Sequence, residues 1–150
     1  MAGRIRPLVT HAVALALASS ALPCAAQSPA QARTLYVLHC AGCHSMDGSG
    51  VPDKGVPSMR GTLGRYLHLP EGRAFLVQVP GVLNAGLTDP QIAAITNWAL
   101  VEFSAGTLPA AWAPYTAQEV AQARLDRPLD VARARAELWR RLEGAAPSGR

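Results

Sequence analysis

The sequence predicts a small all-α domain followed by a C-terminal helical extension. Its 150 residues allow one core, because a single domain usually comprises roughly 100 to 150 residues. Stretches with a helical spacing of apolar residues alternate with stretches rich in Gly and Pro, which favour loops. Aromatic residues make up only 5% of the chain, so a large bound apolar group would help its small and aliphatic side chains to form a core.

Residues 1–26 are typical of an export signal. Arg4 and Arg6 precede the apolar run LVTHAVALALASSAL, and small residues lead to a predicted cut after Ala26. The run is too short for a membrane span, which needs about 20 apolar residues. A lipoprotein signal that uses Cys24 is the alternative, although the preceding Pro23 fits it poorly. We expect a soluble periplasmic protein with no transmembrane span in its mature chain.

The first half of the mature chain is expected to form a tether, a helix and a long loop. Residues 27–33 are interpreted as the tether, and residues 34–44 as a helix with Thr34 at its N-cap. From 49 to 70 the chain is rich in Gly and Pro, so we expect it to wrap around something rather than form regular elements.

Two further helices are expected before residue 104. Residues 72–79 form a short apolar run that stops at Pro80 and Gly81. The strongest helical pattern covers residues 88–104, with Thr88 as N-cap and Pro90 in the first turn, where proline is tolerated.

The extension comprises residues 105–150 and begins with a linker rich in Gly and Pro. Thr116 and Glu119 have the spacing of a capping box, and Pro128 divides the following pattern into two short amphipathic helices that pack on the domain. Their arginines form either a solvated helical face or a docking surface for an acidic partner.

The chemistry is concentrated in Cys40-Ala41-Gly42-Cys43-His44, a C-x-x-C-H pattern typical of c-type haem attachment. Two thiols on one helical turn can add to the two vinyl groups of a porphyrin. The adjacent histidine can then bind the iron. Covalent attachment keeps haem bound outside the cytoplasm, which agrees with an export signal.

Other interpretations of this motif have less support. A zinc site needs a second cluster of ligands, and none has the required spacing. A thioredoxin-like dithiol needs a βαβ setting, and a disulfide across the two-residue gap would leave His44 unexplained. The net charge of +4 includes Arg4 and Arg6 of the signal, and no basic face interleaved with aromatics appears, so nucleic acid is not an expected partner.

Residues 34–104 resemble a class I monohaem cytochrome c domain. The resemblance rests on CAGCH, the following DGSG, the turn GVPSMRG and the helix LTDPQIAAITNWALVEF. It implies a small cytochrome c-like domain wrapped around one covalent haem, with Cys40 and Cys43 as attachment sites and His44 as proximal iron ligand. It also implies that Tyr36 contacts Trp98 where the first and last helices cross. The backbone carbonyl of Pro57 is then expected to bind the ring nitrogen of His44 that faces away from iron.

The sixth iron ligand of the family is a methionine, and here its position is occupied by Val79. Met59 and His68 are the candidate distal ligands, although a core position for Met59 and an exposed loop position for His68 are the simpler interpretations. Met46 lies too close to His44 to reach the other side of the ring. An iron with an open sixth position is therefore a further alternative.

The haem propionates need cationic partners where they are partly buried. Arg73 is one candidate, and Arg60 and Arg65 in the wrapping loop are the others.

The resemblance implies a periplasmic electron carrier that passes single electrons between a dehydrogenase and a terminal acceptor. Its expected partners are redox proteins: a dehydrogenase, an oxidase or another cytochrome. It is not expected to be an enzyme itself, although it could be the cytochrome subunit of a dehydrogenase complex with residues 105–150 as docking arm. The alternative is a haem protein whose open distal site binds a diatomic ligand or peroxide.

Overall fold

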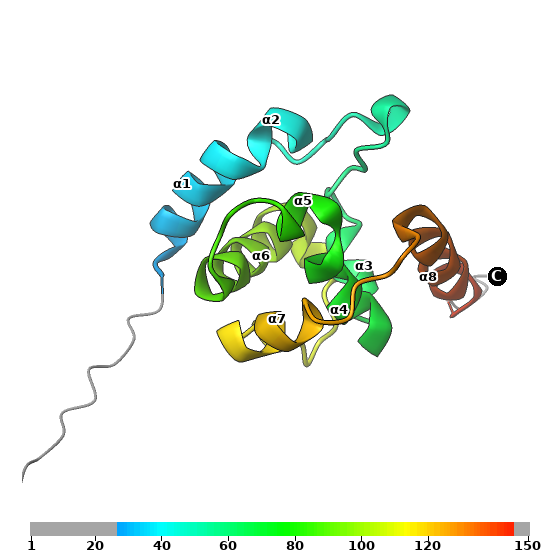
Figure 1. Ribbon diagram of the computed structural model, residues 1–150. Coiled ribbons are helices and arrows are strands. Elements are labelled where there is room, and N and C mark those ends of the chain that lie inside the picture. Colours follow the sequence, from blue (N-terminus) through cyan, green and yellow to red (C-terminus); the bar gives the residue numbers. More distant parts are fainter. Residues whose placement is uncertain (1–26, 146–150) are drawn as a thin grey trace, which may run out of the picture.

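A computed structural model describes residues 27–145, and these are mostly helical (Figure 1). The only strand-like pairing among them is an isolated bridge between Val51 and Val56, so the predicted all-α class is confirmed. The predicted signal peptide, Cys24 included, lies outside the described residues. The elements are α1 (Pro29–His39), α2 (Ala41–His44), η1 (Pro52–Lys54), α3 (Leu63–Tyr66), α4 (Pro70–Gln78), α5 (Pro80–Leu83), α6 (Asp89–Ser104), η2 (Ala105–Thr107), α7 (Ala117–Ala123) and α8 (Val131–Ala145).

Within residues 27–145, no helix combines the length and the apolar character that a membrane span requires.

The first helix begins earlier than expected, so the predicted tether at 27–33 is wrong. Ser28 is the N-cap of α1, and its hydroxyl accepts a hydrogen bond from the backbone N–H of Gln31. The Gln31 side chain accepts in return from the Ser28 backbone N–H at 2.8 Å. This reciprocal capping, with Pro29 at the first helical position, satisfies backbone donors that a tether would leave to water. Thr34, the predicted N-cap, lies inside the helix and donates its hydroxyl to the Ala30 carbonyl.

Helices α1 and α6 pack against each other through aromatic side chains, as the resemblance implies. The ring centroids of Tyr36 and Trp98 lie 5.0 Å apart, and Phe103 lies 5.3 Å from each of them. Tyr36 is almost fully buried, and its hydroxyl donates to the Ser45 carbonyl at 2.6 Å. The predicted contact between Tyr36 and Trp98 is confirmed, and it holds the end of α1 against the main core.

Helix α6 begins at the predicted residue, and its last residue is hydrogen-bonded to the wrapping loop. Thr88 is its N-cap, and the Gln91 side chain accepts from both the backbone N–H and the hydroxyl of Thr88. At the other end, the buried Ser104 hydroxyl donates to the Met59 carbonyl at 2.7 Å and accepts from the Leu63 N–H. The segment from 49 to 70 is irregular as predicted, apart from η1 and the single turn of α3.

The two halves of the extension have different roles. Tyr115 and Val120 are buried in the main core with residues of α1, α4 and α6, so α7 is part of the domain. Thr116 caps α7 as predicted, but the Glu119 side chain does not close a capping box. It pairs instead with Arg73 of α4 through two hydrogen bonds, one of 2.9 Å, because α4 brings a guanidinium within reach.

Helix α8 packs on α3 and α4 through a second, smaller apolar cluster. Tyr66, Phe75, Leu138 and Leu142 are buried in it, and Val79 and Trp139 pack against them. The Arg65 guanidinium lies 4.3 Å from the centroid of the Trp139 ring, an arrangement that favours cation–π attraction. The predicted break at Pro128 is confirmed, because α7 ends at Ala123 and α8 begins at Val131.

Replacing Gly72 with alanine is expected to destabilise the fold. Alanine normally stabilises a helix interior by up to about 1 kcal/mol relative to glycine. At Gly72 of α4, however, an added Cβ would collide with the Tyr66 carbonyl oxygen, and overpacking of this kind typically costs about 1 to 3 kcal/mol. Denaturant unfolding measures the difference. Gly81→Ala is the matched control, because a Cβ there meets open space, and equal stability of the two variants would contradict the prediction.

Candidate functional site: the cysteine and histidine turn

The two cysteines and the histidine of the motif continue the path of α1. Cys40 is the C-cap residue of α1, and α2 follows at once. The His44 N–H donates to the Cys40 carbonyl at 2.9 Å, so the three side chains belong to a single helical turn. Both cysteines are free thiols. Burial, and then the neighbouring Cys43, raise the pKa of the half-buried Cys40 thiol, whereas Cys43 is exposed.

A sharp reversal after α2 brings the wrapping loop back to His44. Ser45 has a φ of 65°, and Gly48 and Gly50 also have positive φ angles, which glycine adopts without strain. The Gly50 N–H donates to the His44 carbonyl at 2.9 Å. A Cβ on Gly50 would collide with the carbonyl oxygen of Pro57, so glycine is required for the close approach of residues 50 and 57.

His44 is half-buried, and burial lowers the pKa of its imidazole. The backbone carbonyl of Pro57 acts in the opposite direction, and the charge of Arg135 lowers the pKa further. The ring nitrogen Nδ1 is buried and has no hydrogen-bond partner of good geometry among residues 27–145. The structure thus brings Pro57 to His44, but the orienting hydrogen bond expected for an iron-bound ring stays a prediction.

These residues fit a covalently attached haem. Two free thiols and an imidazole lie on one turn, and the low pKa of His44 favours the neutral ring that binds a metal. A buried ring nitrogen without a hydrogen-bond partner is uncommon in folded proteins, so the surroundings of His44 within residues 27–145 leave one of its polar atoms unsatisfied. Among residues 27–145, no three His, Cys, Asp or Glu side chains are grouped to hold a metal ion by themselves.

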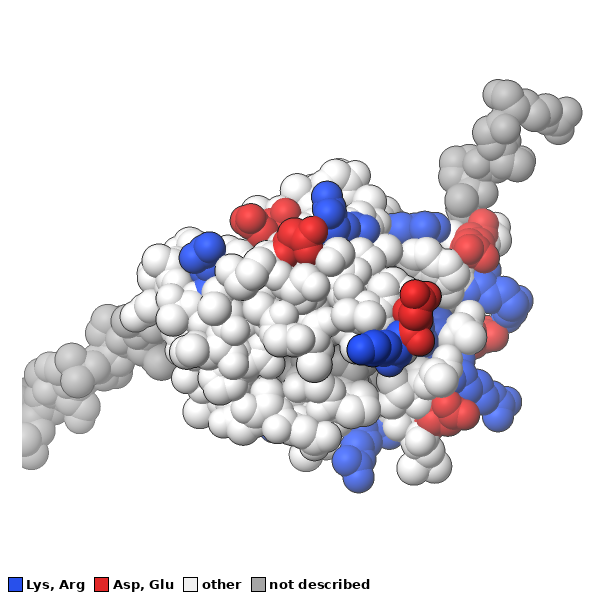
Figure 2. All heavy atoms as spheres, turned by 90° about the horizontal axis from the view of Figure 1, so that it is seen from above, with Lys and Arg blue, Asp and Glu red and all other residues white. Residues whose placement is uncertain are grey.

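Exposed apolar side chains occur near the motif. Four exposed or nearly half-exposed hydrophobic side chains flank it in sequence: Val37, Leu38, Met46 and Val51. Figure 2 views the molecule from the side on which α1 and α2 lie in Figure 1. Acidic and basic side chains lie along its upper centre as well as at the right, on the side of α8. Charged side chains are interspersed with the apolar ones near the motif, since Asp47 and Arg60 form an exposed ion pair at 3.0 Å.

The residues proposed as distal ligands are engaged elsewhere in the structure. Met59 packs half-buried against the main core, and its backbone bonds to Gly48 and Ser104. His68 is exposed, with Nε2 at 3.1 Å from the Thr107 carbonyl oxygen. Val79 lies between α4 and α5 and packs against the second cluster. The simpler interpretations of Met59 and His68 therefore agree with their surroundings, and a role for either as iron ligand stays a prediction.

The arginines proposed as propionate partners also have partners within the protein. Each of the three guanidinium nitrogens of Arg73 donates, two to Glu119 and one to the Ala113 carbonyl, and the group stacks on Tyr115. Arg60 pairs with Asp47 at 3.0 Å, and Arg65 lies over Trp139. Arg73 anchors α4 to the segment that leads into α7, and its expected role at a propionate stays a prediction.

The sequence does not single out Arg135, whose charge is the smallest of the three influences on the pKa of His44 and lowers it. It lies in the arginine-rich segment interpreted as either a solvated face or a docking surface. Its spacing from Val131, Leu138 and Leu142 is that of one helix face, which is the signal that could have found it.

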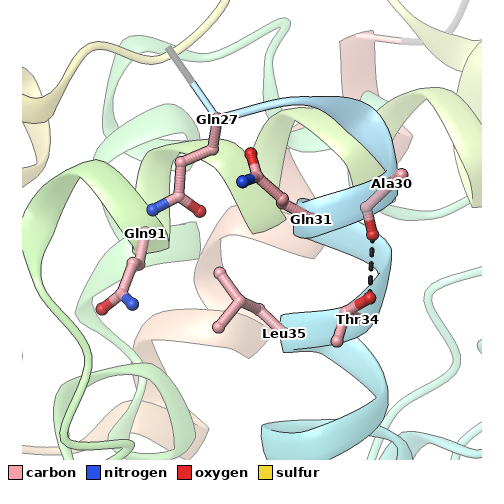
Figure 3. A pocket seen from close by; sticks show the side chains of 6 residues that line it. All are labelled: Gln27, Ala30, Gln31, Thr34, Leu35 and Gln91. Atoms are coloured by element: carbon pink, nitrogen blue, oxygen red, sulfur yellow. Dashed lines mark hydrogen bonds between the residues drawn. The ribbon is translucent and has the colours of Figure 1, made fainter. Parts of the chain in front are cut away.

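A surface pocket of about 400 Å³ lies at the other end of α1, against the start of α6 (Figure 3). The side chains that line it carry no titratable group, and the Thr34 hydroxyl among them is already bonded to the Ala30 carbonyl. None of the motif residues contributes to it, so it is not the candidate site. Its lining residues are Gln27, Ala30, Gln31, Thr34, Leu35 and Gln91.

No protein-family model matches the chain, and no curated protein matches its sequence. The interpretation of the site therefore depends on its residues and their geometry.

Proposed function

We propose that the chain is a periplasmic c-type cytochrome that carries single electrons through one covalently bound haem. The observation that carries the proposal is the turn from Cys40 to His44. Two free thiols and an imidazole with a buried, unpartnered nitrogen lie together there. The neutral imidazole favoured by burial is the form that binds iron.

Each residue of the turn has a separate task in this proposal. The thiols of Cys40 and Cys43 would form thioether bonds, and His44 would bind iron with one ring nitrogen. The carbonyl of Pro57, brought close by Gly50, would orient the ring and raise its basicity. When bound, haem supplies an iron that takes up and releases one electron, with a potential set by ligand, burial and nearby charge.

The proposed partners are redox proteins: a dehydrogenase, an oxidase or another cytochrome. Cys43 is exposed, and the apolar side chains of Leu38 and Met46 lie exposed near it in sequence. Exposed apolar side chains beside the attachment site would add to the contact with such a partner.

Expression of the full chain with a cytochrome c maturation system tests the proposal. The periplasmic fraction is run on a denaturing gel, stained for haem and then titrated for its redox potential. We expect haem that survives denaturation, with a reversible one-electron transition. Haem lost on denaturation, or none at all, would refute the proposal.

A second candidate function is binding of a diatomic ligand at an open iron position. The surroundings of Val79, Met59 and His68 favour this function, because none of the three positions offers a side chain that is free to bind iron. Met59 packs in the core, and His68 contacts Thr107. The ferrous holoprotein is expected to bind CO rapidly in this case. Slow or undetectable CO binding, with a spectrum changed by Met59→Ala or by His68→Ala, would instead identify that residue as distal ligand.

A further inference from the structure

The segment that links α7 to α8, residues 124–130, is anchored to the main domain at two points. The side-chain amide of Gln78, the last residue of α4, donates to the Asp126 carbonyl. Arg124 pairs at 2.6 Å with Asp89, the first residue of α6. These contacts hold the segment beside α4 and α6, so the side chains that follow Arg124 have defined neighbours.

Two leucines of this segment lie on the surface. Leu125 is 80% exposed and Leu129 is fully exposed, and these are the largest exposed fractions among the large apolar side chains of residues 27–145. Single exposed leucines are common in soluble proteins, so exposure alone does not indicate a site. Leu129, however, also lines a cavity, whereas Leu125 does not.

The cavity lies between this segment and α5, and its volume is about 210 Å³. Pockets that bind drug-sized ligands usually measure about 300 to 1,000 Å³, so this smaller cavity suits a single side chain. The apolar residues that line it are Pro80, Leu83, Pro128, Leu129 and Val131.

Arg127 gives the cavity a positive charge. It is the one charged residue among the described residues that line the cavity, because Asp126 and Asp130 do not contribute to the lining. Arg127 is exposed, and no Asp or Glu within residues 27–145 forms an ion pair with it. Asn84 lines the same cavity and has a side-chain amide that can donate. The cavity therefore combines apolar walls with groups that favour a carboxylate.

We propose that this cavity binds the C-terminal residue of a partner protein in which that residue is apolar. The side chain would enter the cavity against Leu83 and Leu129, and the terminal carboxylate would pair with Arg127. A terminal residue carries its carboxylate and its side chain on one Cα. Neighbouring side chains of an extended chain point in opposite directions, so an internal acidic residue beside an apolar one fits the cavity less well.

Of the two interpretations of the arginines in the extension, the docking surface is thereby assigned to Arg127. The cavity contains no residue of the cysteine and histidine turn. Binding at the cavity therefore goes beyond the proposed function and does not depend on haem.

The test is an NMR titration of the full chain with N-acetyl-leucine, which has the side chain and the carboxylate of such a terminus. We expect saturable shifts of the Asn84 and Leu129 signals, with a dissociation constant on the order of 1 mM for so small a ligand. N-acetyl-leucinamide has the same side chain without the carboxylate, and we expect it to bind roughly fivefold more weakly. The blocked dipeptide acetyl-Leu-Asp-amide, whose carboxylate belongs to the next side chain, is also expected to bind more weakly than N-acetyl-leucine.

Arg127→Gln removes the charge from the cavity and is expected to weaken the binding of N-acetyl-leucine roughly fivefold. Arg133→Gln is the matched control, because Arg133 is exposed and does not line the cavity. It is expected to retain the affinity of the unchanged chain. The NMR spectrum of each variant without ligand shows whether its fold is retained.

Three outcomes would overturn the proposal: equal affinity for N-acetyl-leucine and its amide, unchanged affinity in Arg127→Gln, or an equal fall in Arg133→Gln. Equal or tighter binding of acetyl-Leu-Asp-amide would overturn the choice of a terminal carboxylate. None of these outcomes affects the proposed function, whose failure is recognised separately by the absence of covalent haem in the unchanged chain.

Discussion

Replacing Cys40 and Cys43 together with alanine is expected to abolish covalent haem. Each thiol supplies one of the two bonds to the cofactor, and both lie on the turn that ends in His44. The measurement is haem staining of the denatured periplasmic fraction. We expect at least a tenfold loss of stain at equal protein, because no further cysteine is present in residues 27–150.

Cys24→Ala is the matched control for this pair, since the third cysteine lies in the predicted signal peptide. It is expected to leave haem staining unchanged. Full staining in the double variant would contradict the attachment role of Cys40 and Cys43. His44→Ala keeps both thiols, and it is expected to change the visible spectrum of whatever haem attaches, because the proximal ligand is missing.

Replacing Tyr36 with alanine is expected to cause the largest loss of stability. The side chain is 1% exposed and packs against Trp98 and Phe103, and large aromatic truncations in a core cost about 3 to 5 kcal/mol. Burial also raises the pKa of Tyr36 to about 12, as expected of a phenol that stays neutral in the folded chain. Denaturant unfolding of the unchanged chain and the variant, compared in the same haem-loading state, measures the loss.

Tyr36→Phe separates the packing of the ring from its hydrogen bond. It keeps the aromatic contacts and removes only the 2.6 Å bond to the Ser45 carbonyl, so a cost of about 1 to 3 kcal/mol is expected. Similar losses of stability in Tyr36→Ala and Tyr36→Phe would contradict the prediction that packing of the ring contributes most. Because Ser45 directly follows His44, the phenylalanine variant is also expected to loosen the motif.

The local elements of the fold were largely predictable from the sequence. Three such features are the N-cap of α6 at Thr88, the cap of α7 at Thr116 and the break at Pro128. Each of them depends on residues that lie within four positions of it in the sequence. The start of α1 was missed because the capping pair Ser28 and Gln31 was overlooked in a segment interpreted as a tether.

The functional side chains outside the motif were harder to predict. Arg73, whose role at a propionate stays a prediction, pairs with Glu119, a residue far along the chain. Glu119 was expected to close a capping box, but its carboxylate is stabilised more by an arginine than by a backbone N–H. The spacing of Arg73 and Glu119 in the sequence carries no information on their contact, because this contact depends on how α4 and α7 pack.

The sequence by itself determined the candidate chemistry: Cys40, Cys43 and His44 must share one helical turn wherever the turn lies, because their spacing is local. Only the tertiary structure decided their surroundings. It brought the Pro57 carbonyl to His44 through the turn at Gly50, buried α7 in the main core, and packed α8 on α3 and α4. These arrangements result from burial of apolar faces that are distant in sequence, which local spacing cannot specify.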